Sequence, residues 1–437
     1  MEAVVLGMTV RIILFLAASL PVIYDAVTLR IIDRKRQEPL PEEVSDVYSP
    51  ERWNTFVRYK HDARIPYLIR RGWAFFLDAF VIFSPFYAWI ESASGADVYL
   101  AVLLTGIIMT LIPLIVNLPV SLYQVFQIEQ RYGLNHRTPK EFWKDFIIEL
   151  LGGFVLNILL YELLTFILLH LRAWTGDFSL SAGYSVLLSS AIAAVLLAFI
   201  YGASWISWRL MRMRYRFVPL EDDELKDAIM KLLKGSRRNV SRIEVYNESA
   251  KSNSKNAFVL KLPFYRSIGI ADNFLSENAR DELLGVLAHE AGHLKHKPNI
   301  LNWLSWVIYA LLFFCLVSAV KNGEVIALAE RMLENVFHLQ RMNTMLSVNA
   351  VIWLFQPVFF LLSVLRKYVS RSEEYEADRN AVAEGYGEPL IRTFKEISSD
   401  ELVDVNPSDL IEFLEYDHPG MYHRIRAIHQ AMHGAAS

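Results

Sequence analysis

Two histidines and a glutamate in the second half of the chain have the spacing of a metal-dependent hydrolase. His289, Glu290 and His293 form the pattern His-Glu-x-x-His. On a helix, residues four apart lie on one face, so both imidazoles can reach one zinc ion. Glu290 projects beside that face, where it can take a proton from water that zinc has acidified. The run before the motif is apolar, as a buried helix requires: Leu283, Leu284, Val286 and Leu287.

A catalytic zinc site needs a third protein ligand and one open position. His296 lies on the same helical face, but three ligands so close on one straight helix do not readily surround a tetrahedral ion. A better candidate lies in an acidic segment further along, where Glu374 and Asp378 are four apart. Glu374 would bind the metal, and Asp378 would orient a ligand histidine. Spacing alone leaves Glu373 and Glu376 open as alternatives to Glu374.

The composition of the chain predicts a protein that is largely solvated by lipid. Its 437 residues are 54% hydrophobic and 21% charged, with a mean hydropathy of +0.26, more apolar than is usual for a soluble protein. A net charge of -3 predicts no nucleic-acid partner, and a single cysteine excludes an intrachain disulfide. Seven stretches are long enough to cross a hydrocarbon core about 30 Å thick: 4–25, 72–92, 97–123, 146–170, 183–208, 299–320 and 344–366.

Basic residues in the connecting segments indicate the orientation of these spans. They follow spans one, three, five and seven and include Arg34, Lys35, Arg36, Arg131, Arg137, Lys140, Arg209, Arg212, Arg214, Arg366 and Lys367. This bias puts the N-terminus outside and residues 209–298 and 367–437 in the cytosol. We expect a membrane domain over 1–208 and a metalloprotease domain over 209–437 that includes the last two spans.

Short β-branched runs between residues 240 and 273 predict a small sheet ahead of the zinc-binding helix. The sequence therefore predicts a mainly α fold. Its parts are a seven-helix transmembrane bundle or barrel and a cytosolic zincin-like α+β metalloprotease domain.

Three segments resemble those of one family, the integral-membrane zinc metalloproteases of the CAAX prenyl protease 1 type. The first is the pair of zinc motifs, His289 to His293 and Glu374 to Asp378. The second is Glu129-Gln130-Arg131-Tyr132-Gly133-Leu134-Asn135, and the third is His418-Pro419 followed by Arg424. The zinc motifs alone also resemble the heat-shock membrane protease branch, but the segment at 129–135 favours the prenyl-protease branch.

The resemblance implies a role for each matching residue of the site. It assigns Glu374 as the third ligand of one zinc ion per chain and Asp378 as the support of a ligand histidine. It places His418 and Arg424 near the site, where they would stabilise the oxyanion.

The resemblance also implies how the substrate binds. Asn256, Ala257 and Phe258 resemble the family's edge strand, which binds the backbone of the substrate as an added strand. Family members enclose a water-filled chamber within seven helices, and eukaryotic ones cleave prenylated Cys-a-a-X proteins. The implied location is the plasma membrane of a prokaryote, or the endoplasmic reticulum of a eukaryote.

We therefore expect a membrane zinc metalloendopeptidase that cleaves near the C-terminus of prenylated or other membrane-associated peptides. One alternative is a quality-control protease of the heat-shock type. An intramembrane site-2 protease is a second, but the charged segment 295–298 directly after the motif disfavours it. A transporter or scaffold with a non-catalytic zinc site is a third, and the presence of Glu290 disfavours that class.

Overall fold

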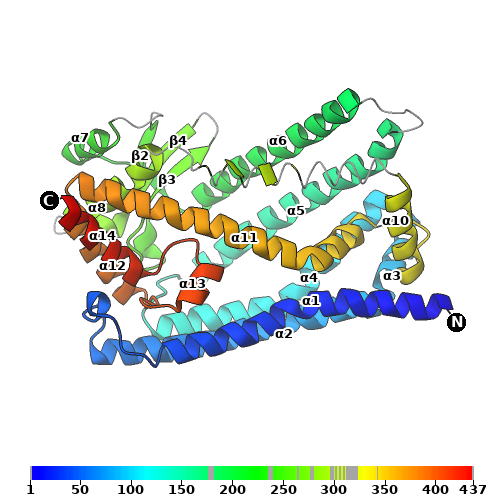
Figure 1. The fold of residues 1–437 in the computed structure, drawn as a ribbon, viewed down its shortest axis with the longest axis horizontal. Coiled ribbons are helices and arrows are strands. Elements are labelled where there is room, and N and C mark those ends of the chain that lie inside the picture. The colour runs from blue at the N-terminus through cyan, green and yellow to red at the C-terminus, as the bar shows by residue number, and fades with distance from the viewer. Residues whose placement is uncertain are drawn as a thin grey trace.

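Long helices run beside one another over most of the molecule, and a small sheet with short helices lies at one end (Figure 1). The computed structural model describes residues 2–175, 182–234, 240–262, 265–275, 280–295, 323–341 and 343–435, with a few positions between 300 and 311. The long helices are α1 (Glu2–Lys35), α2 (Pro50–Phe83), α4 (Val98–Tyr123), α5 (Pro139–Thr175), α6 (Ala182–Arg214) and α11 (Thr344–Ala383). The N-terminus lies at the end opposite the sheet.

Membrane-capable helices account for most of the predicted spans. Within the described residues, five helices are long and apolar enough to cross a membrane, or six if α2 and α3 (Phe86–Ala93) form one bent span. The predicted span at 72–92 falls on the end of α2 and on α3, between which the chain bends by 67°. Pro85 lacks the N–H that would continue the helix, and Ser84 before it is extended. The predicted span 299–320 lies almost wholly outside the described residues.

The sheet has four strands in the order β1-β2-β4-β3. These are β1 (Phe217–Pro219), β2 (Arg242–Tyr246), β3 (Ala257–Leu262) and β4 (Tyr265–Ala271). Strands β2 and β4 are parallel, and the other two pairs are antiparallel. The strands between 240 and 273 were expected, whereas β1 is three residues long and ends in proline, too short to give a β pattern. Strand β3 pairs with β4 alone in the described part of the sheet, which leaves one of its edges open.

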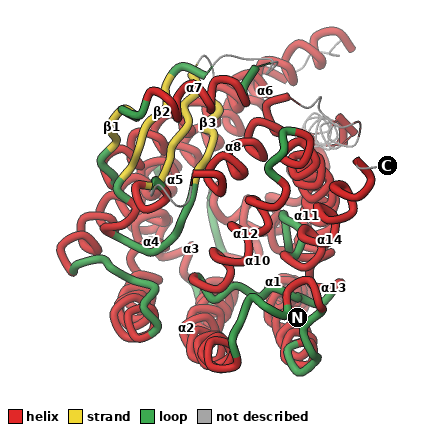
Figure 2. The backbone as a smooth tube through the Cα atoms, turned by 90° about the vertical axis from the view of Figure 1, so that its left-hand side faces the viewer, coloured by secondary structure: helices red, strands yellow, loops and turns green. Residues whose placement is uncertain are grey.

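Short helices pack around the sheet and build the apolar core at this end. They are α7 (Asp223–Leu232), α8 (Arg280–Lys295), α12 (Gly387–Asp400) and α14 (Met421–Ala435). Helix α13 (Asp409–Glu415) contacts α11 and α1, and α10 (Gly323–Phe337) lies at the far end. Single turns complete the described elements: the 3₁₀ helices η1 (Glu42–Val44), η3 (Glu248–Ala250) and η4 (Asp272–Phe274), and the π-helix η2 (Gln124–Glu129). Figure 2 shows α8 between the sheet and α11, with which α8 makes close contact.

The segment between α1 and α2, together with the start of α2, belongs to this same core. Val44 and Phe56 are fully buried in it together with residues of α8 and α14. The Tyr48 hydroxyl lies within hydrogen-bond distance of the carbonyls of Ser398 and Val403, at 2.7 and 2.6 Å. Part of the region 1–208 thus supports the end of the molecule that carries the His-Glu-x-x-His motif.

Candidate metal centre

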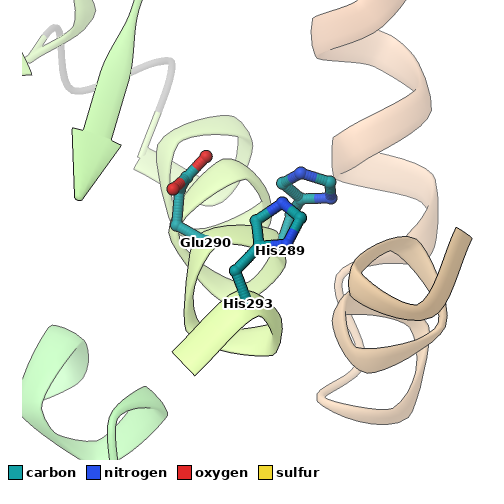
Figure 3. A group of neighbouring side chains, drawn as sticks. All are labelled: His289, Glu290 and His293. Carbon is teal, nitrogen blue, oxygen red and sulfur yellow. The ribbon is translucent and has the colours of Figure 1, made fainter. Parts of the chain in front are cut away.

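Helix α8 carries the His-Glu-x-x-His motif in the orientation that its spacing predicts. The imidazoles of His289 and His293 project from the side of α8 that faces a neighbouring helix, and Glu290 points toward a strand of the sheet (Figure 3). Their potential ligand atoms all lie within 4.8 Å of one another. The side chain of His289 is almost fully buried, and that of His293 is 18% exposed. The motif therefore lies at the boundary between the core and an open face.

The two helices that carry the site approach each other closely because small residues line their interface. A Cβ atom added to Gly292 would lie 2.8 Å from the Cα atom of Ala377 on α11, closer than real Cβ atoms come. Ala288, Ala291 and Ala377 are wholly buried. The Asn380 amide donates to the Ala288 carbonyl at 2.7 Å and ties the helices together at this level. The residues between the two histidines therefore set the distance to α11.

Replacing Gly292 by alanine should separate α8 from α11 and weaken metal binding. The added methyl group meets backbone rather than a flexible side chain, so we expect a loss of about 1–3 kcal/mol in stability. Thermal unfolding and metal content of the purified protein measure both effects. Gly153→Ala is the control, since a Cβ atom there meets nothing within 4 Å. Equal metal content in Gly292→Ala and the unmodified protein would contradict this prediction.

Helix α11 brings Glu374 to both imidazoles. Its Oε2 atom lies 3.4 Å from Nε2 of His289, and its Oε1 atom lies 3.3 Å from Nε2 of His293. Four ligands at about 2.0–2.1 Å from zinc are about 3.3–3.4 Å apart at the corners of a tetrahedron. Oε2 is buried, makes no hydrogen bond of ordinary geometry within the described ranges, and also lies 3.5 Å from Nη2 of Arg424. Two imidazoles and one buried carboxylate at these separations fit a zinc ion.

The other acidic candidates on α11 are less suited to this role. Glu374 is 5% exposed, whereas Glu373 and Glu376 are partly exposed. His296 lies outside the described residues. Burial and the two short contacts thus single out Glu374 among the glutamates that spacing alone could not separate.

Asp378 and Arg424 contact the Nδ1 atom of His289, and Arg424 also lies 3.5 Å from Oε2 of Glu374. The His289 Nδ1 atom is 2.9 Å from Oδ1 of Asp378, which orients the ring so that Nε2 faces Glu374. Arg424 on α14 donates to both Asp378 oxygens, at 3.0 and 2.7 Å, and its guanidinium lies over the Phe394 ring at 4.1 Å. Asp378 is 1% exposed and Arg424 is 7% exposed. Arg424 therefore holds the carboxylate that orients the histidine.

The charges around His289 favour a cation at this point. Burial by itself lowers the pKa of His289, but the Asp378 carboxylate at Nδ1 and the Glu374 carboxylate 3.4 Å from Nε2 outweigh burial and raise that pKa to about 9. A buried pocket that stabilises positive charge between two carboxylates suits a metal ion.

Replacing Asp378 by asparagine should weaken metal binding without removing a ligand. Partners that orient a ligand histidine typically contribute about 10- to 100-fold to metal affinity, and we expect a loss in that range. Competition with a chelator of known affinity measures it. Asp409→Asn is the matched control, because Asp409 is exposed and its ion pair with His423 is long, at 3.8 Å. If both variants bind metal as tightly as the unmodified protein, Asp378 does not orient His289.

His418 lies at the open side of the site. Its Nε2 atom is 3.5 Å from Oε1 of Glu374, and its ring is 58% exposed. Nδ1 is 2.9 Å from the carboxylate of Asp417, which is itself exposed. An exposed imidazole beside the ligand cluster can reach a bound substrate, whereas the buried Arg424 is occupied by Asp378.

The predicted substrate strand begins β3, which contacts α8. Asn256 accepts from the Ala271 amide, and Ala257 is buried. The Phe258 ring packs against Tyr246, 5.6 Å between centroids, and over Gly269. The side chains of this segment therefore support the sheet, and the open backbone edge of β3 is the part available to a ligand.

Sequence and fold comparisons agree on the family. The family model described as CAAX prenyl protease N-terminal, five membrane helices, matches residues 29–206, and that of Peptidase family M48 matches residues 219–432. A CAAX prenyl protease 1 homolog of Arabidopsis thaliana is 25% identical over 427 residues, 92% of each chain. CAAX prenyl protease 1 of Saccharomyces cerevisiae is 26% identical over 331 residues, covering 72% of this chain and 69% of that one.

The fold comparison covers nearly the whole molecule. The crystal structure of S. mikatae Ste24p superposes with a TM-score of 0.80 at 21% sequence identity, covering 96% of this chain and 99% of the other. The predicted recognition and enzyme class are thus confirmed, as is the prediction of a multi-pass membrane protein. The chain belongs to peptidase family M48 and is a membrane metalloendopeptidase of the CAAX prenyl protease type that acts on peptide or protein substrates.

Proposed function

We propose that this peptidase uses one zinc ion held by His289, His293 and Glu374. The observation that carries the proposal is the pair of separations between the buried Glu374 carboxylate and the imidazoles: 3.4 Å from Oε2 to His289 and 3.3 Å from Oε1 to His293. Two nitrogen donors and one carboxylate, with a fourth side open, are a frequent ligand set of catalytic zinc. When bound, zinc supplies Lewis acidity that acidifies water and polarises a peptide carbonyl.

The protein groups around the metal divide the proton transfers and the positioning between them. Glu290 accepts a proton from the attacking water and passes it to the leaving amine, because its carboxylate lies beside the ligand histidines and not among their partners. His418 donates to the oxyanion from the exposed side. Asp378 orients His289, and Arg424 holds Asp378. The oxyanion role that the resemblance implies for Arg424 stays a prediction, and the role proposed here is positioning, because Arg424 is buried and donates to both Asp378 oxygens.

The substrate is a peptide laid along the edge of β3, with its scissile bond near the C-terminus of a prenylated or other membrane-associated protein. Strand β3 has an open edge and contacts α8, the helix that carries the two histidines, so a peptide paired with β3 would lie near the site. The names of the relatives support a prenylated substrate. We also propose seven spans, a membrane domain over 1–208 and a protease domain over 209–437. The catalytic end faces the cytosol, because the basic residues at the ends of α1 and α6, after α4 and in the second half of α11 all lie toward that end.

The test is cleavage of a farnesylated C-terminal peptide beside its unprenylated twin by the detergent-purified protein, with bound metal quantified. We expect one zinc per chain, cleavage that a chelator abolishes and zinc restores, and faster cleavage of the farnesylated peptide. Equal cleavage of the two peptides would keep the peptidase and reject prenyl recognition. Cleavage that survives metal removal would reject the proposed mechanism.

A further inference from the structure

A groove lined by arginine and aromatic side chains lies where α6 reaches the sheet. Its volume is about 310 Å³. The lining residues are Trp205, Trp208, Arg209, Arg212, Arg242 and Tyr265. The first four belong to the last turns of α6, Arg242 begins β2, and Tyr265 begins β4. One helix end and two strand ends thus build the groove together, at the junction visible in Figure 1.

The groove carries positive charge that its surroundings do not neutralise. Arg212 donates to both oxygens of Glu244, the nearest contact being 2.9 Å, and so has an anionic partner. Arg209 and Arg242 are exposed and make no hydrogen bond or ion pair with the residues that the structure describes. Two guanidinium groups without a carboxylate therefore line one hollow, and a guanidinium fork matches the oxygens of a phosphate.

The position of the groove along α6 matches the boundary between hydrocarbon and headgroups. The preceding turns of this membrane-capable helix expose apolar side chains, among them Ile200, Tyr201 and Ile206. The arginines begin directly after them, at Arg209. Trp205 lies at the transition, with its ring 5.7 Å from that of Tyr265. Tryptophan and tyrosine prefer this level of a membrane because their rings are apolar with one polar edge.

We propose that this groove binds the headgroup of an anionic phospholipid. Arg209 and Arg242 bind the phosphate, the aromatic rings cover the glycerol, and the acyl chains lie along the exposed apolar face of α6. The aromatic walls and the adjoining apolar face favour a lipid over a soluble phosphate, which needs the two arginines alone. The proposal goes beyond peptide cleavage. It also gives the enzyme a lipid contact at β4, the neighbour of the strand proposed to bind substrate.

Native mass spectrometry of the protein in a neutral detergent tests the proposal. Dioleoylphosphatidylglycerol is the probe, with dioleoylphosphatidylcholine and soluble glycerol phosphate as comparisons. Each arginine at an anionic membrane surface contributes about a fivefold factor, so Arg209→Gln/Arg242→Gln should weaken phosphatidylglycerol binding roughly 25-fold. The control is Arg34→Gln/Arg58→Gln, which removes the same charge from two exposed positions. Arg34 lies at the C-terminal end of α1, and Arg58 lies near the N-terminal end of α2.

Selective binding of one phosphatidylglycerol that is lost in the groove variant and kept in the control supports the proposal. Equal losses in the two double variants would overturn it, since they would show attraction by net charge alone. Glycerol phosphate binding as tightly as the lipid would also overturn it in favour of a soluble anion. Thermal unfolding of each variant establishes that the fold is retained, as expected for exposed arginines without hydrogen bonds.

Discussion

Glu290→Gln should reduce the rate of peptide cleavage by about 10²- to 10⁴-fold while the protein keeps its metal. Glutamine has the size and shape of glutamate but cannot accept the proton of the attacking water. Glu290 lies beside the two imidazoles, on the side of the sheet, and is not one of the three proposed ligands, so its loss should leave the ligand set complete. Steady-state cleavage of a fluorogenic peptide and elemental analysis of the purified variant measure the two effects separately.

The matched control for this variant is Glu282→Gln, the same chemical change on the same helix. Glu282 pairs with Arg392, which is 54% exposed, and an exposed pair of this kind contributes less than about 1 kcal/mol. We expect near-normal cleavage in the control. A Glu290→Gln protein that still cleaves at the normal rate would remove Glu290 from the mechanism. One that has lost its metal would make Glu290 a ligand.

Glu374→Ala should lose both metal and activity. Removing a partner outside the ligand set already weakens zinc binding by about 10- to 100-fold, so removing a ligand should exceed the upper end of that range. The substitution also leaves two imidazoles and Arg424 around a pocket that has lost one of its two carboxylates. Zinc affinity measured by chelator competition, together with peptide cleavage, checks this prediction.

Glu373→Ala and Glu376→Ala are the matched controls, because they remove the same group from the same helix within two residues. Both should keep metal and cleave the peptide, since Glu374 is the buried glutamate in contact with both histidines. Metal loss in either control, with metal retained in Glu374→Ala, would move the third ligand to that position.

The pattern at 289–293 was interpretable from sequence because its geometry is local. Helical spacing alone brings His289 and His293 to one face and sets Glu290 beside them, whatever surrounds the helix. Membrane-capable helices were predictable for a similar reason, since the length of an apolar run decides whether it can span a bilayer. The break at Ser84-Pro85 shows the limit of that approach, because a hydropathy average passes over a proline that ends a helix.

The contacts between distant segments were decided by packing. Glu373, Glu374 and Glu376 are equivalent as sequence, and the rotation of α11 against α8 determines that Glu374 meets the imidazoles. That rotation and the short interhelical distance depend on Gly292 and Ala377, two small residues 85 positions apart, whose role no local pattern reveals. The sequence shows small residues in each segment, but it does not show that these two segments pack against each other.

The same reasoning explains Arg424 and the segment around Phe56. The motif resemblance placed Arg424 near the site, but only the tertiary structure buried its guanidinium and paired it with both oxygens of Asp378. Phe56 was assigned with the membrane domain by its position in the chain, yet it is fully buried in the core that supports α8. Sequence by itself therefore determined the chemistry and the membrane class, because spacing and hydropathy are properties of short segments. The tertiary structure decided which glutamate, which arginine and which buried side chains complete the site, because those contacts join segments far apart in the chain.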